Sequence, residues 1–75
     1  MKVYRIKIDD LFYVKAIAFG GEPFLNIIPT WDITEAAWYE EDKAKKYCED
    51  LNKQEEMKEA DIKFTLEEVD YYERV

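Results

Sequence analysis

Residues 40–51 read EEDKAKKYCEDL, and this stretch decides the fold class of the chain. Its apolar residues recur at the i, i+3, i+4 and i+7 positions of one helix face. They are Ala44, Tyr47, Cys48 and Leu51. Carboxylates fill the first turn, where the helix dipole favours negative charge. The pattern predicts one amphipathic helix that starts at about Glu40 and ends between Asn52 and Lys58.

The residues at the N-terminal end of the chain have the pattern of a β-hairpin. Apolar and charged side chains alternate over residues 2–8, as in a strand with one buried side. Two aspartates at positions 9 and 10 supply turn chemistry, and a second, mostly apolar strand follows over residues 11–19. Glycines at positions 20 and 21 and a proline at 23 end this unit.

Three further segments complete the expected fold. Residues 24–31 are apolar but contain Pro29, which indicates at best a short edge strand. Residues 36–39 are expected to be extended, and residues 61–69 alternate like a last strand. We therefore expect a single α+β domain spanning residues 1–75. Its small antiparallel sheet of three to four strands has one helix packed across it, in the order β-β-(β)-α-β.

Charge is distributed unevenly along the chain. Residues 1–31 carry four basic and three acidic side chains (4 − 3 = +1), whereas the remainder carries seven basic and fifteen acidic ones (7 − 15 = −8). The net charge of −7 repels nucleic acid and anionic lipid and attracts basic surfaces. We therefore expect a basic protein partner, with no direct contact to nucleic acid or to a membrane.

The residue types also argue against catalysis. The chain has no histidine, and its single cysteine, Cys48, lies on the helix stripe, where a small buried hydrophobe is wanted. The carboxylate clusters at residues 9–10, 40–42 and 67–70 lack the spacing of a calcium loop. We expect no enzyme activity, no metal and no cofactor. A carboxylate-only metalloenzyme is the remote alternative. One cysteine and no apolar leader favour the cytoplasm.

Two acidic patches are the candidate partner-binding residues. The first interleaves carboxylates with aromatic rings, a combination suited to arginine-rich surfaces. It consists of Glu67, Glu68, Asp70, Tyr71 and Tyr72. The second consists of Asp50, Glu55 and Glu56. The alternatives are that the aromatic residues only cover the sheet and that the carboxylates only confer solubility.

An apolar segment before the helix is a candidate self-interface. It consists of Phe24, Leu25, Ile27, Ile28 and Trp31. If these side chains stay exposed, only a second copy or another partner would cover them. The alternative is that they cap the open sheet within one chain.

The segment around the start of the helix supports a resemblance. The run WDITEAAWY at residues 31–39 precedes EDKA at residues 41–44, and Tyr47 and Leu51 follow. With these residues as its main motif, the segment from Tyr4 to Leu51 resembles small uncharacterised proteins of bacteriophages and mobile elements. The resemblance implies a small sheet with one helix laid across it. It also implies a role among small inhibitors of host defence, including anti-CRISPR proteins, in the cytoplasm of a host cell.

The leading hypothesis is therefore a non-enzymatic binding module whose acidic half occupies a basic, nucleic-acid-handling site on a partner protein. Carboxylates on a rigid scaffold would stand in for phosphates. Two alternatives remain open. One is a structural protein that forms a homodimer or larger homo-oligomer, and the other is an antitoxin-like neutraliser of a basic toxin.

Overall fold

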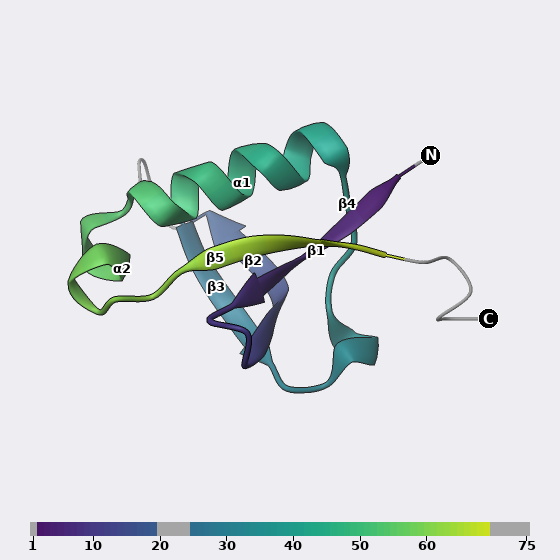
Figure 1. The fold of residues 1–75 in the computed structure, drawn as a ribbon, viewed down its shortest axis with the longest axis horizontal. Coiled ribbons are helices and arrows are strands. Elements are labelled where there is room, and N and C mark those ends of the chain that lie inside the picture. Colours follow the sequence, from purple (N-terminus) through teal and green to yellow (C-terminus); the bar gives the residue numbers. More distant parts are fainter. Residues whose placement is uncertain (1, 20–24, 70–75) are drawn as a thin grey trace.

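The protein forms one antiparallel sheet with a long helix packed across it (Figure 1). The computed structural model describes residues 2–19 and 25–69. In chain order the elements are β1 (Val3–Ile8), β2 (Phe12–Phe19), β3 (Leu25–Thr30), the 3₁₀ helix η1 (Ile33–Glu35), β4 (Tyr39–Glu40), α1 (Glu41–Lys53), α2 (Glu55–Glu59) and β5 (Phe64–Glu68). The predicted α+β class is confirmed, with five strands in the described residues where we expected three or four.

Strand β1 is the centre of the sheet. It pairs with β5 along its whole length, from Tyr4 opposite Glu68 to Ile8 opposite Phe64. Its other side is divided, because β2 pairs with its end and β4 pairs with its start. β3 pairs with β2 and lies at the outer side of the sheet. The first and last strands of the chain are thus neighbours, so the basic front and the acidic back of the sequence are not separate regions of the molecule.

A bulge allows β2 to leave β1 and run with β3. The register between β2 and β3 shifts between Val14 and Ala16, which bends the strand. The Ala37 N–H donates to the Val14 carbonyl at 3.0 Å, so the segment before β4 fills the space that β2 leaves beside β1. This contact explains how residues 36–39 are extended although β4 itself has only two residues.

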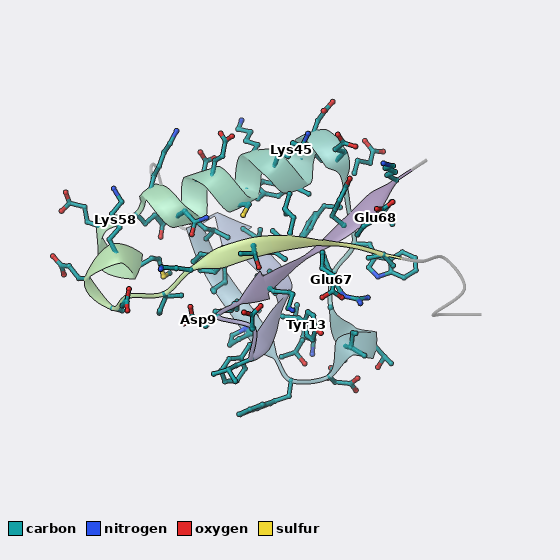
Figure 2. The ribbon with its side chains drawn as sticks, in the orientation of Figure 1. Asp9, Tyr13, Lys45, Lys58, Glu67 and Glu68 are labelled. Atoms are coloured by element: carbon teal, nitrogen blue, oxygen red, sulfur yellow. The ribbon has the colours of Figure 1, made fainter. Side chains whose placement is uncertain are left out.

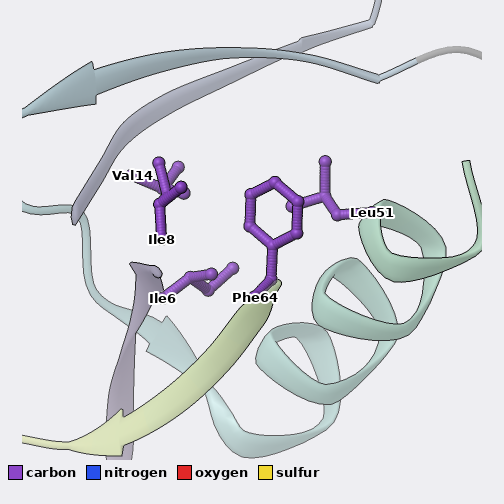
Figure 3. Close-up of a cluster of buried hydrophobic side chains, with 5 residues drawn as sticks. All are labelled: Ile6, Ile8, Val14, Leu51 and Phe64. Carbon is purple, nitrogen blue, oxygen red and sulfur yellow. The ribbon is translucent and has the colours of Figure 1, made fainter. Parts of the chain in front are cut away.

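The core lies between the sheet and α1 (Figure 3). Its buried residues are Ile6, Ile8, Val14, Leu51 and Phe64. The predicted helix stripe is confirmed, since Ala44 and Leu51 are fully buried and Tyr47 and Cys48 pack half-buried beside them. Burial of each large aliphatic side chain contributes about 1.5 to 3 kcal/mol.

Helix α1 begins within one residue of the expected position and ends inside the expected range. Lys45 Nζ lies 2.9 Å from Glu41 Oε1, the i, i+4 ion pair that the sequence indicates. The helix stops at Gln54, whose ψ of 128° is extended, and α2 begins at the next residue. No helix within residues 2–19 and 25–69 is long and apolar enough to cross a membrane.

Hydrogen bonds join the β1–β2 turn to the segment before β5 at one end of the sheet. Asp9, Asp10 and Asp61 have positive φ values of 51°, 59° and 56°, a conformation that short polar side chains tolerate. The Asp9 N–H donates to the Lys63 carbonyl at 2.9 Å, and Asp9 Oδ1 accepts from the Lys63 N–H at 2.8 Å. The β1–β2 turn therefore anchors the start of β5.

Candidate functional site

The sheet face opposite α1 carries a network of internal ion pairs. The Arg5 side chain is buried, with Arg5 3% exposed, and its Nε donates to Glu67 Oε1 at 2.7 Å. Its guanidinium also lies 5.4 Å from the centre of the Tyr13 ring. Lys7 Nζ lies 3.4 Å from Glu67 Oε2 and 3.2 Å from Asp10 Oδ1. The hydrogen bonds with Asp10 and then Glu67 raise the pKa of the Lys7 ammonium.

This network bears on the role that the sequence indicated for Glu67. Its carboxylate already serves two cations of the same chain, and the side chain is only 30% exposed. Glu67 is therefore engaged within the chain, and its role in partner binding stays a prediction. Glu68 is exposed and turns to the other face of the sheet, as alternation along β5 requires (Figure 2). The remaining members of this predicted patch, Asp70, Tyr71 and Tyr72, lie outside the described residues.

The second predicted patch belongs to a run of six carboxylates within residues 49–61, at the end of α1, in α2 and in the turn that follows, and we call this run the acidic corner. It consists of Glu49, Asp50, Glu55, Glu56, Glu59 and Asp61. All of these residues are exposed except Asp50, which is half-buried. Residues 49–61 carry these six carboxylates and two lysines, so the local charge is 2 − 6 = −4. The structure gives none of the six an ion pair within its described ranges.

Contacts with the core hold the main chain of the acidic corner in place. Met57 and Ile62 pack against the core, and the Ile62 N–H donates to the Met57 carbonyl at 2.9 Å. Asp61 takes the positive φ that reverses the chain toward β5. These contacts fix the position of the main chain that carries the carboxylates. Three of these carboxylates, Glu49, Glu59 and Asp61, are not among the residues predicted from the sequence. The sequence predicts the end of the helix only as a range, so it does not show which carboxylates lie near that end.

The two predicted patches do not merge into one surface. Glu68 ends β5 beside the start of β1, whereas the acidic corner lies around α2 at the other end of β5 (Figure 2). Glu68 lies four residue steps along the strand from Phe64, a distance of about 13 Å. The carboxylates are therefore spread along the molecule, and only the acidic corner groups several without internal partners among the described residues.

The predicted apolar self-interface is exposed in part. Ile28 is 52% exposed and Trp31 is 76% exposed, but Ile27 packs against the core. Phe24 lies outside the described residues, and the side chain of Leu25 is likewise not described. Trp31 contacts the Phe12 ring, with 4.2 Å between the ring centres. The sequence missed Leu11 and Ile33, which are also exposed near this end of the sheet.

The reactivity of the Cys48 thiol tests the interpretation that this residue has a structural role. Its Sγ donates to the Phe64 carbonyl at 3.2 Å, and burial, followed by the charge of Glu49, raises the pKa of the thiol. Because the thiolate is the reactive form, we expect Cys48 to react with Ellman's reagent more slowly than glutathione at neutral pH. Unfolding in urea should remove the difference. Fast reaction of the folded protein at neutral pH would contradict this.

An amide side chain caps the exposed side of β5. Asn52 Nδ2 donates to the Phe64 carbonyl at 2.9 Å, and Asn52 Oδ1 accepts from the Phe64 N–H at 2.9 Å. The side chain thereby makes the two bonds that a neighbouring strand would make. Beside it lies an open depression of about 450 Å³, lined by Asn52, Asp61, Phe64 and neighbouring residues.

Residues 2–19 and 25–69 contain no group of three or more carboxylate or cysteine side chains placed to hold a metal ion. What this arrangement offers chemically is a charged surface and a partly open strand edge. In comparisons with known proteins, no family model, no curated protein and no solved structure matches the chain.

Proposed function

We propose that this protein is a non-enzymatic binding module whose acidic corner occupies a basic, nucleic-acid-handling site on a partner protein. The observation that carries the proposal is the contrast between two groups of carboxylates. Glu35, Glu41 and Glu67 are engaged by lysine or arginine of the same chain. The acidic corner has no such partners among the described residues and keeps a local charge of −4.

The mechanism would be the replacement of phosphates by carboxylates. Unpaired carboxylates attract arginine and lysine and steer association over about one Debye length, ~10 Å at 0.1 M salt. Arginine accepts a carboxylate in the same bidentate way as a phosphate. The resemblance to phage proteins would place the target among host-defence proteins that bind nucleic acid. An antitoxin-like protein would use the same surface against a basic toxin.

The test compares two charge reversals of equal size. In the first variant, Glu55→Lys and Glu56→Lys bring the local charge of the acidic corner to −4 + 4 = 0. In the matched control, Glu40→Lys and Asp42→Lys change the start of α1. Both variants have a net charge of −7 + 4 = −3, and both place lysines at a helix start, so their effects on stability are comparable.

Each variant serves as bait in a host lysate, and the captured proteins are identified by mass spectrometry. We expect the unmodified protein and the control to capture a nucleic-acid-binding protein. This protein should elute between about 0.1 M and about 1 M salt and should lose its nucleic acid when bound. The corner variant should lose at least about tenfold in capture, because two charged contacts of 1.5 to 3 kcal/mol are removed. Equal capture by both variants would refute the choice of site.

Self-assembly is a second candidate function, favoured by the exposure of Ile28 and Trp31. Large exposed apolar side chains often mark an interface between proteins. Size exclusion at micromolar concentration distinguishes the two candidates. A monomer at all salt concentrations counts against self-assembly, whereas a dimer that Trp31→Lys dissociates supports it.

A further inference from the structure

The outer edge of β5 has hydrogen-bonding groups that no described residue uses. Val69 N–H donates to the Val3 carbonyl, and Asp9 N–H donates to the Lys63 carbonyl, both at 2.9 Å. In an antiparallel ladder the bonded residues alternate, so Lys63, Thr65, Glu67 and Val69 turn their main-chain groups toward β1. Phe64, Leu66 and Glu68 must therefore turn theirs outward. Of these three, only Phe64 has a partner for its outward groups within residues 2–19 and 25–69.

Asn52 limits the open edge at one end. Its amide occupies the N–H and the carbonyl of Phe64, so a strand that adds to β5 can bond only from Leu66 onward. β3, the other outer strand, is a poorer template because Pro29 has no N–H to donate. β5 contains no proline and pairs with β1 over its five residues without a bulge. The open edge of β5 thus presents two donors and two acceptors at Leu66 and Glu68.

Charge decides which kind of chain would occupy this edge. Glu68 is exposed and has no ion pair among the described residues, and the acidic corner lies at the other end of β5. A second copy of the chain would bring another net charge of −7 to the same edge, which disfavours pairing between copies. An extended segment rich in arginine or lysine is attracted by Glu68 at one end of β5 and by the acidic corner beyond the other end.

We propose that the outer edge of β5 binds an extended basic segment of the partner protein, which adds to the sheet as a strand beside Leu66 and Glu68. This inference rests on the proposed function and gives its binding mode. Main-chain hydrogen bonds to Leu66 and Glu68 fix the position of the segment, and its basic side chains meet Glu68 and the acidic corner. The depression beside Asn52 and Phe64, which Lys58 and Lys63 also line, receives an apolar side chain of the segment where pairing stops.

The probe is a short synthetic peptide in which arginine and valine alternate. Its first control carries an N-methyl group on every main-chain amide, so that it keeps its charge but has no N–H on either edge to pair with a strand. Its second control has glutamate in place of arginine. Binding to the full chain is followed by two-dimensional NMR of amide groups, by amide hydrogen exchange and by titration calorimetry.

We expect the arginine peptide to slow exchange of the Leu66 and Glu68 amides by about tenfold or more, with little change at Thr65, whose N–H already faces β1. N-methylation should weaken binding by about tenfold. Equal binding of both basic peptides, with changes only at the acidic corner, would overturn strand addition and leave the proposed function standing. Protection by the glutamate peptide would overturn the basic occupant. Binding by neither basic peptide at low salt would count against both proposals.

Discussion

Replacement of Glu67 by lysine is expected to cost a large part of the stability of this domain. The substitution removes the carboxylate that Arg5 and Lys7 share and places a third cation beside them. Because Arg5 is buried, loss of the Glu67 carboxylate beside it is expected to cost about 3 kcal/mol or more. A 75-residue domain has a total stability of about 4 to 11 kcal/mol. The corresponding fall in Tm is about 12 to 24 °C.

The adjacent residue provides the control. Glu68→Lys makes the same change of charge one position along β5, but Glu68 is exposed and has no ion pair within the described residues. Its Tm should stay within a few degrees of the unmodified protein. Thermal unfolding followed by circular dichroism measures both. Equal melting temperatures for the two lysine variants would show that the ion pair of Arg5 and Glu67 does not hold the sheet together.

A double substitution separates the loss of the pair of Arg5 and Glu67 from the burial of the Arg5 charge beside a new lysine. Arg5→Met combined with Glu67→Met removes both charges and fills the space with apolar side chains. Replacement of a buried ion pair by packed hydrophobic residues is often neutral or stabilising. We therefore expect the double variant to melt well above Glu67→Lys. A double variant as unstable as Glu67→Lys would assign the loss to packing of the Arg5 side chain instead.

Replacement of Asn52 by alanine has the second-largest expected effect. It removes both bonds to the main chain of Phe64, although Cys48 Sγ still donates to the Phe64 carbonyl. A buried donor left unsatisfied costs about 1 to 3 kcal/mol, and the better helix propensity of alanine offsets roughly half a kcal/mol of this. We expect a net loss of about 1 to 2 kcal/mol, or about 4 to 16 °C in Tm.

Hydrogen exchange makes this prediction specific to one amide. The Phe64 N–H should exchange much faster in Asn52→Ala, whereas the Thr65 N–H, which faces β1, should change only with global stability. Lys53→Ala, at an exposed position of the same helix, is the matched control for helix propensity. Unchanged exchange at Phe64 would show that the Asn52 amide does not cap β5 in solution.

The assignment of Glu67 shows what a strand pattern can and cannot tell. Alternation in residues 61–69 separates Glu67 from Phe64 and Leu66, and alternation in residues 2–8 separates Arg5 from Ile6. The opposite charges on the two polar faces were therefore a visible signal for pairing. The register of Arg5 opposite Glu67 was not visible, because it depends on which strands are neighbours in the sheet.

The acidic corner depended on tertiary structure for a different reason. Its carboxylates are spread over thirteen residues, 49–61, in two helices and a turn. The main chain that carries them is placed by the end of α1 at Gln54 and by the packing of Met57 and Ile62 against the core. Helix propensity alone does not place that stop, since the residues on both sides of Gln54 favour helix.

By itself the sequence determined the α+β class, the start of the helix and the buried stripe, because hydrophobic periodicity reports which side of an element is buried. It also determined the net charge and hence the basic character expected of a partner. Only the tertiary structure decided which carboxylates remain open, because β5 pairs with β1 and brings Glu67 onto Arg5. The net charge of a chain depends only on its composition, whereas the electrostatic potential at its surface depends on which charged side chains lie next to one another.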